Sequence, residues 1–202
     1  MALYVRKTDW HPALEQLAER EQRLFACDCA EHVLHYFENL LSDDRRIREA
    51  IEVARQFAHG NASQENLQDA KATAEAAAWE ASNVAYSDEP GSFAADAAAS
   101  AAAATEAACW YGVGDSLWSS EAALEAAKSA ANIAIEVVEI AAVGSDVANQ
   151  IWTKGWDAVN AQWSNAMGES KALEEDWQNE RIISYVNQNK QGNRDENLHS
   201  DS

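Results

Sequence analysis

The clearest pattern in the sequence is a run of apolar positions that recur every three or four residues between residues 22 and 41. At about 100° per residue, this spacing gathers the apolar side chains on one side of a helix. That side comprises Ala26, Cys29, Ala30, Val33, Leu34, Phe37, Leu40 and Leu41. The opposite side comprises Cys27, Asp28, Glu31, His32, His35, Glu38 and Asn39. The segment predicts an amphipathic helix with one face on a core.

Helical spacing continues through the rest of the chain, and no segment alternates with the period of two that a strand requires. Pro12 suits a first helical turn, and Gly60 suits a helix stop. Further helices are predicted over about 12–20, 45–59, 64–87, 92–112, 120–143, 146–167 and 170–187. The fold class is therefore all-α, a single-domain array of about seven or eight helices packed as helical hairpins over residues 1–186. Residues 187–202 contain no apolar residue but Leu198, which predicts a disordered polar tail.

Composition changes this picture in two ways. Hydrophobic residues make up 47% of the chain, but many of them are alanines, so the larger core side chains must come from the eight tryptophans and the scattered Leu, Ile, Val and Phe. The formal net charge is −19, from 15 basic and 34 acidic residues. Such a charge repels nucleic acids and anionic membranes and attracts a basic protein partner.

The start of the chain lacks a signal-peptide pattern and the cysteines number only three, which predicts a cytoplasmic protein with free thiols.

The arginines are concentrated in the helix predicted over 45–59. Arg48, Glu52 and Arg55 follow one another along one flank of its apolar face. We expect them to form a structural ion-pair seam with acids of the preceding helix, which are Asp28, Glu31 or Glu38. The alternative is an anion or carboxylate site, because arginine pairs with carboxylates through two parallel hydrogen bonds.

Three tryptophans share one stripe of the helix predicted over 146–167, namely Trp152, Trp156 and Trp163. We expect the stripe to pack against the alanine-rich helices, which offer few large side chains. Three indoles on one stripe are also typical of an interface anchor, so these residues are the candidate partner-binding site.

No motif of a known catalytic site is present in the sequence. Cys27 and Cys29 point about 200° apart on a helix, which argues against a shared metal ion. Asp28, His32 and His35, with Glu31 beside them, do share a face and are the only candidate metal ligands, although a solvated polar face is the favoured interpretation. No catalytic residue, cofactor or metal is predicted.

Two stretches resemble a bacterial family of "putative immunity proteins", the immunity-protein-five-like domain. The opening stretch consists of Cys29-Ala-Glu-His-Val-Leu, Phe37-Glu and the segment from Asp43 to Gly60, and the closing stretch of Glu175-Asp-Trp177-Gln-Asn-Glu-Arg181 with Ile183 and Tyr185. The alanine-rich middle is similar to the long helices of that family. Relatives often have histidines in those helices, whereas this chain has none between His59 and His199. The resemblance implies an all-helical cytoplasmic protein thought to neutralise a toxin.

Three functions follow from these observations. The leading hypothesis is an intracellular immunity protein that binds a basic toxin and blocks it by steric and electrostatic occlusion. The second is a non-catalytic helical interaction scaffold or an oligomeric structural protein without a toxin, and self-association is left open. The third, an enzyme or metal-binding bundle that uses the face of Asp28, Glu31, His32 and His35, is the least favoured.

Overall fold

The computed structural model describes residues 10–85, 109, 119–154 and 156–200, with side chains over 12–83, at 109, and over 122–142 and 164–188. In these ranges the chain forms six helices and no strand, which confirms the all-α fold class. The helices are α1 (Trp10–Glu15), α2 (Glu19–Leu40), α3 (Arg46–Ala58), α4 (Gln64–Ala85), α6 (Ser119–Lys154) and α7 (Trp156–Ser200). The helix predicted over 92–112 lies outside the described residues, Cys109 excepted.

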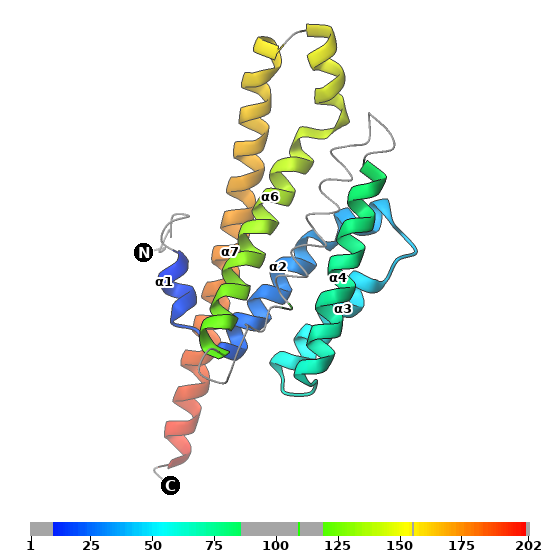
Figure 1. Ribbon diagram of the computed structural model, residues 1–202. Helices are drawn as coiled ribbons and strands as arrows, with labels where there is room; N and C mark the ends of the chain where they lie inside the picture. The colour runs from blue at the N-terminus through cyan, green and yellow to red at the C-terminus, as the bar shows by residue number, and fades with distance from the viewer. Residues whose placement is uncertain (1–9, 86–108, 110–118, 155, 201–202) are drawn as a thin grey trace.

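Helix α2 is the centre of the arrangement (Figure 1). On one side of it α3 packs against α4, and on the other α6 packs against α7. The helices therefore associate in pairs, as the predicted hairpins require. Helix α2 contacts α3 as well as α6 and α7, so it connects the two pairs.

This central position buries more of α2 than the sequence pattern predicted. Cys27 and Asp28, which we placed on the polar side, are buried. The amphipathic pattern identifies the most apolar side of a helix, but α2 has neighbours on two sides, and they cover the flank as well. Glu31, His35 and Asn39 remain exposed, as predicted.

Alanine makes up most of the buried face of α6. These fully buried residues are Ala123, Ala126, Ala127, Ala130, Ala131 and Ala134. Because alanine has no side chain beyond Cβ, neighbouring helices can approach closely along such a face. Phe25 and Phe37 of α2 are also fully buried and supply large side chains to the same core.

The end of α3 confirms the stop that was predicted at Gly60. Gly60 has a φ of 73°, a left-handed conformation that favours glycine. Its amide donates to the Phe57 carbonyl over 2.9 Å, and the Asn61 amide donates to the Gln56 carbonyl over 2.8 Å. This pair of bonds is a Schellman motif, which satisfies carbonyls that the helix end leaves without an amide partner.

Several predicted helix boundaries in the second half of the chain are wrong. Helix α6 continues through the break that we predicted at Gly144-Ser145-Asp146, and α7 continues through Gly168. A glycine inside a helix costs only about 1 kcal/mol, which a long helix tolerates. Helix α7 also extends to Ser200, into the segment predicted to be a disordered tail. The division of the chain at residue 186 stays a prediction.

Candidate functional site

The side chain of Asp28 is the centre of an ionic cluster that joins three helices. Arg55 of α3 places Nη2 2.9 Å from Oδ1 of Asp28. Arg181 and Tyr185 of α7 donate from Nε and from the hydroxyl to Oδ2, each over 2.6 Å. A buried carboxylate is stable only when its oxygens are paired and hydrogen-bonded, and here both oxygens are.

The Asp28 carboxylate contributes to raising the pKa values of the three side chains around it. Burial raises the pKa of the Tyr185 hydroxyl, and its hydrogen bond to Asp28 raises that pKa further. The hydrogen bond to Asp28 also raises the pKa of Arg181. Burial acts to lower the pKa of Arg55, but the charges around it, Asp28 foremost, outweigh burial and the pKa is raised. Both guanidinium groups therefore stay charged and Tyr185 stays protonated at neutral pH.

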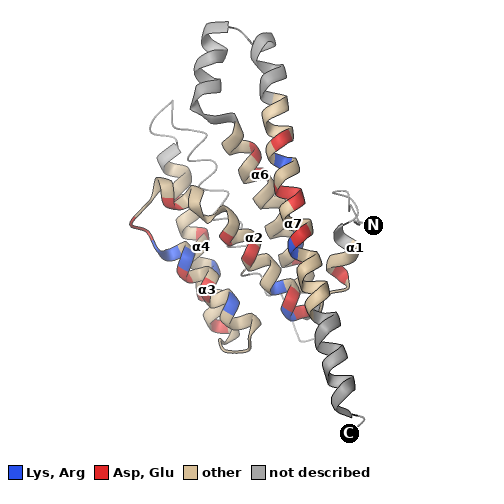
Figure 2. Cartoon of the chain, turned by 180° about the vertical axis from the view of Figure 1, so that it is seen from behind, with Lys and Arg blue, Asp and Glu red and all other residues tan. Residues whose placement is uncertain are grey.

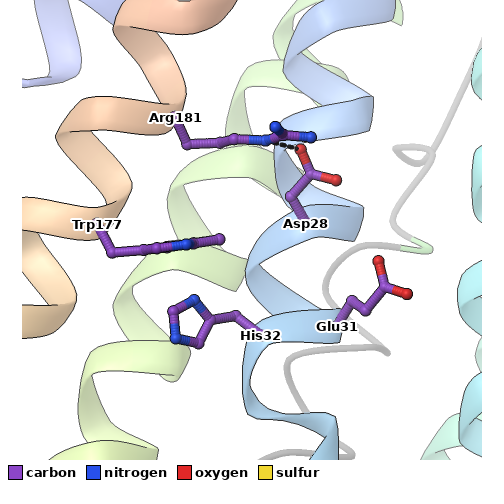
Figure 3. A pocket seen from close by; sticks show the side chains of 5 residues that line it. All are labelled: Asp28, Glu31, His32, Trp177 and Arg181. Atoms are coloured by element: carbon purple, nitrogen blue, oxygen red, sulfur yellow. Dashed lines mark hydrogen bonds and ion pairs between the residues drawn. The ribbon is translucent and has the colours of Figure 1, made fainter.

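A pocket of about 320 Å³ opens beside the cluster (Figure 3). It is lined by Asp28, Glu31, His32, Trp177 and Arg181. Trp177 and Arg181 project from α7 toward α2, which carries the other three side chains (Figure 3). The edge of one ring meets the face of the other where His32 contacts Trp177, with ring centroids 3.8 Å apart and an interplanar angle of 86°. Arg55 also pairs with Glu31 at the rim.

His32 also contacts a second buried carboxylate, Glu174 of α7. Its Oε2 is 3.6 Å from Nε2 of His32, and its Oε1 accepts a hydrogen bond of 2.9 Å from the Gln178 amide. The same amide donates to the Ala131 carbonyl of α6 over 3.0 Å. Burial raises the pKa of Glu174, because desolvation disfavours the charged form.

The residues of the predicted ion-pair seam lie in and beside this cluster. Arg55 contacts Asp28 and Glu31, and Arg48 lies 2.7 Å from a carboxylate oxygen of Glu38. Glu52 instead accepts a hydrogen bond from Gln56 on its own helix. The acids of α2 thus face the arginines of α3, and whether these pairs stabilise the fold or recognise a partner stays a prediction.

The predicted tryptophan stripe does not lie on one helix. Trp152 belongs to α6, whereas Trp156 and Trp163 belong to α7, so the single helix that we predicted over 146–167 is wrong. Helix α6 ends at Lys154 and α7 begins at Trp156, and both bounds lie within that segment. The side chains of the three tryptophans lie outside the described ones, and their role in partner binding stays a prediction.

The candidate metal face is divided by the packing of α2. Asp28 accepts bonds from two arginines and a tyrosine, and the His35 ring stacks against Tyr36 at a centroid distance of 4.0 Å. Over the described part of the chain, no group of three or more His, Cys, Asp or Glu side chains is placed to hold a metal ion. Cys27 and Cys29 are buried free cysteines, and burial raises the pKa of both thiols.

Sequence reasoning did not identify Arg181 and Tyr185 as partners of Asp28. Both residues belong to the closing stretch around Trp177, which was singled out by its resemblance to the family. That resemblance did not show which residues Arg181 and Tyr185 contact. The opening and closing stretches meet in space at Asp28, although Asp28 and Arg181 are separated by 153 positions in the sequence.

A comparison with known protein families finds a match over part of the chain. Residues 13–109 match the family model described as "Imm-5 like putative immunity protein". The chain thus carries an Imm-5 like segment, which confirms the family resemblance for the opening stretch; the closing stretch lies outside the match. The match covers α2, α3 and α4 and ends before α6 and α7, so Arg181 and Tyr185 of the ionic cluster lie outside it. Neither a curated protein nor a solved structure matches the chain.

No helix within the described ranges is both long enough and apolar enough to cross a membrane.

Proposed function

We propose that this protein is a non-catalytic immunity protein, which binds a basic protein toxin in the cytoplasm and blocks it by covering its surface. The observation that carries the proposal is the match of residues 13–109 to the Imm-5 like family. The net charge of −19 supports a basic partner, because it attracts positive surfaces over a long range and raises the association rate.

The ionic cluster supports a binding function rather than chemistry. Both oxygens of Asp28 are occupied by side chains of the protein, so this carboxylate is not free to act as a base or nucleophile. The cluster also fixes α7 against α2, which keeps the surface that meets a partner rigid before binding. A rigid surface loses less conformational entropy on association.

Co-expression with a toxin tests the proposal. The toxin candidate is a toxic protein encoded beside the gene for this chain, produced in cells with and without the chain. We expect the chain to restore growth, and to do so through a complex that purifies with both proteins. Continued growth arrest in the presence of folded chain, or a neighbouring gene for a metabolic enzyme, would contradict the proposal.

One observation favours a second function, that of an oligomeric scaffold. Helix α7 has 45 residues and its partner α6 has 36, so α7 is the longer helix of the pair. Long helices can associate side by side as coiled coils, which would place self-association on α7. Light scattering separates the two functions, because an immunity protein that acts alone is monomeric before it meets its toxin.

A further inference from the structure

One face of α7 is turned to solvent along about five turns of the helix. Positions three and four residues apart lie on the same side of a helix, and this spacing places six residues on that face. They are Glu169, Leu173, Asp176, Glu180, Ile183 and Asn187, all exposed, and we call them the α7 outer face. The residues that pack into the protein, among them Glu174, Gln178, Ile182 and Tyr185, lie on the opposite side.

The α7 outer face carries apolar side chains where solvent exposure is costly. Leu173 is 72% exposed and Ile183 is 41% exposed. Among the described large hydrophobic residues, only Trp79 on α4 shares this degree of exposure, at 70%. Leu173 and Ile183 are ten residues apart, about 15 Å along the helix, so they offer a partner two separate apolar anchors on one face.

The acids of this face have no basic partner among the described side chains. Over the described ranges, Glu169, Asp176 and Glu180 form no salt bridge. Elsewhere in the protein, arginines form salt bridges with acidic side chains; Arg46, for example, pairs with Asp44 and Glu80. Acidic residues recur along α7 (Figure 2). The face therefore presents uncompensated negative charge around its two apolar side chains.

We infer that the α7 outer face is the surface on which a basic protein partner docks, with its lysines or arginines on the three carboxylates and an apolar contact over Leu173 and Ile183. The inference deepens the proposed function and rests on it, because the partner is the toxin. A second copy of this chain fits poorly, since two such faces would bring three carboxylates against three. A complex with a basic partner is stabilised both by the opposite charges and by the apolar contact.

The length of the face sets the size of the contact. From Glu169 to Asn187 the helix rises about 27 Å at 1.5 Å per residue, which is enough for a partner helix of similar length. An amphipathic helix uses anchors that recur every three or four residues, the spacing that the face itself shows.

A synthetic helix tests the docking chemistry without a known toxin. The probe is a peptide of about 19 residues, with leucines along one side and lysines elsewhere, and the control is the same peptide with glutamates in place of lysines. Hydrogen exchange of the full chain locates the contact, and titration calorimetry measures the affinity. We expect protection of residues 169–187 by the lysine peptide and no binding of the glutamate peptide.

Matched variants decide whether this face carries the affinity. Leu173→Ser with Ile183→Ser should weaken binding about tenfold or more, whereas Trp79→Ser, an equally exposed apolar side chain on α4, should leave it unchanged. Asp176→Asn with Glu180→Gln should weaken binding more than Glu65→Gln with Asp69→Asn on α4, although both pairs remove two negative charges. Protection centred on another helix, an equal loss in the α4 variants, or no difference between the two peptides would overturn the inference.

The outcomes also separate this inference from the proposed function. If the lysine peptide docks on α7 but the chain does not protect cells from the toxin, the proposed function fails and the docking surface stands. If the chain protects cells while the variants at Leu173 and Ile183 protect equally well, the toxin binds elsewhere and the inference fails.

Discussion

Arg181 on α7 donates a 2.6 Å hydrogen bond from Nε to the buried carboxylate of Asp28 on α2, across 153 positions of sequence. With Arg55 on the other oxygen, this bond links the segment that matches the immunity family to the helical hairpin outside the match. The two halves of the chain are thus held together by charge as well as by the alanine-rich core.

Replacing Asp28 with alanine should destabilise the fold strongly. The substitution leaves Arg55 and Arg181 without their shared carboxylate and Tyr185 without its acceptor, a loss of about 3 kcal/mol in the free energy of unfolding. Urea denaturation followed by circular dichroism measures it. The control is Asp69→Ala on the exposed side of α4, which should change the stability by less than about 0.5 kcal/mol. Equal effects of the two substitutions would show that the cluster does not hold the helices together.

The two arginines of α3 should differ in their contributions. Arg55 is 24% exposed and pairs with a buried acid, whereas Arg48 is 54% exposed and pairs with Glu38 at the surface. Arg55→Ala should cost about 2 kcal/mol and Arg48→Ala less than about 1 kcal/mol, and salt should reduce the second effect more than the first. Thermal melts at low and high salt check this. Unchanged melting together with lost partner binding would instead make these arginines a recognition site.

Glu174 should make stability depend on pH. Burial raises its pKa in the folded state above the unfolded value, so the fold prefers the protonated form. Its contribution is therefore most favourable below the unfolded pKa and is lost as the pH rises through the folded pKa. Glu174→Gln should be more stable than the wild type near neutral pH, and the difference should shrink as the pH falls toward about 4. A variant that is less stable at neutral pH would show that the contact with His32 outweighs the cost of burial.

Tyr185→Phe should separate the hydrogen bond from the packing. The phenyl ring keeps the contact with the Arg181 guanidinium, whose carbon lies 5.2 Å from the ring centroid, but the 2.6 Å bond to Asp28 is lost. A hydrogen bond to a charged group contributes about 1.5 kcal/mol or more. We expect a loss of that size in urea denaturation, and no loss would indicate that water replaces the hydroxyl.

Some local features of the fold could be predicted from the sequence, whereas the helix boundaries in the second half of the chain and the long-range contacts could not. Helix α2 and the end of α3 were predicted closely, because their signals depend only on neighbouring residues in the sequence. These signals are the apolar period of residues 22–41 and the glycine at position 60. The breaks expected at Gly144 and Gly168 are absent because a glycine only weakly disfavours a helix. The pairing of Asp28 with Arg181 depends on how distant helices pack, and an alanine-rich sequence carries little information about which helix contacts which.

The most direct test of the account is a kinetic binding measurement between the purified chain and the toxin encoded beside its gene. We predict a one-to-one complex whose association rate falls steeply as the salt concentration rises from about 0.05 to about 0.5 M, while the dissociation rate barely changes. Leu173→Ser with Ile183→Ser should raise the dissociation rate and leave the association rate nearly unchanged. The absence of a complex at micromolar concentrations, or binding that does not depend on salt, would contradict the account.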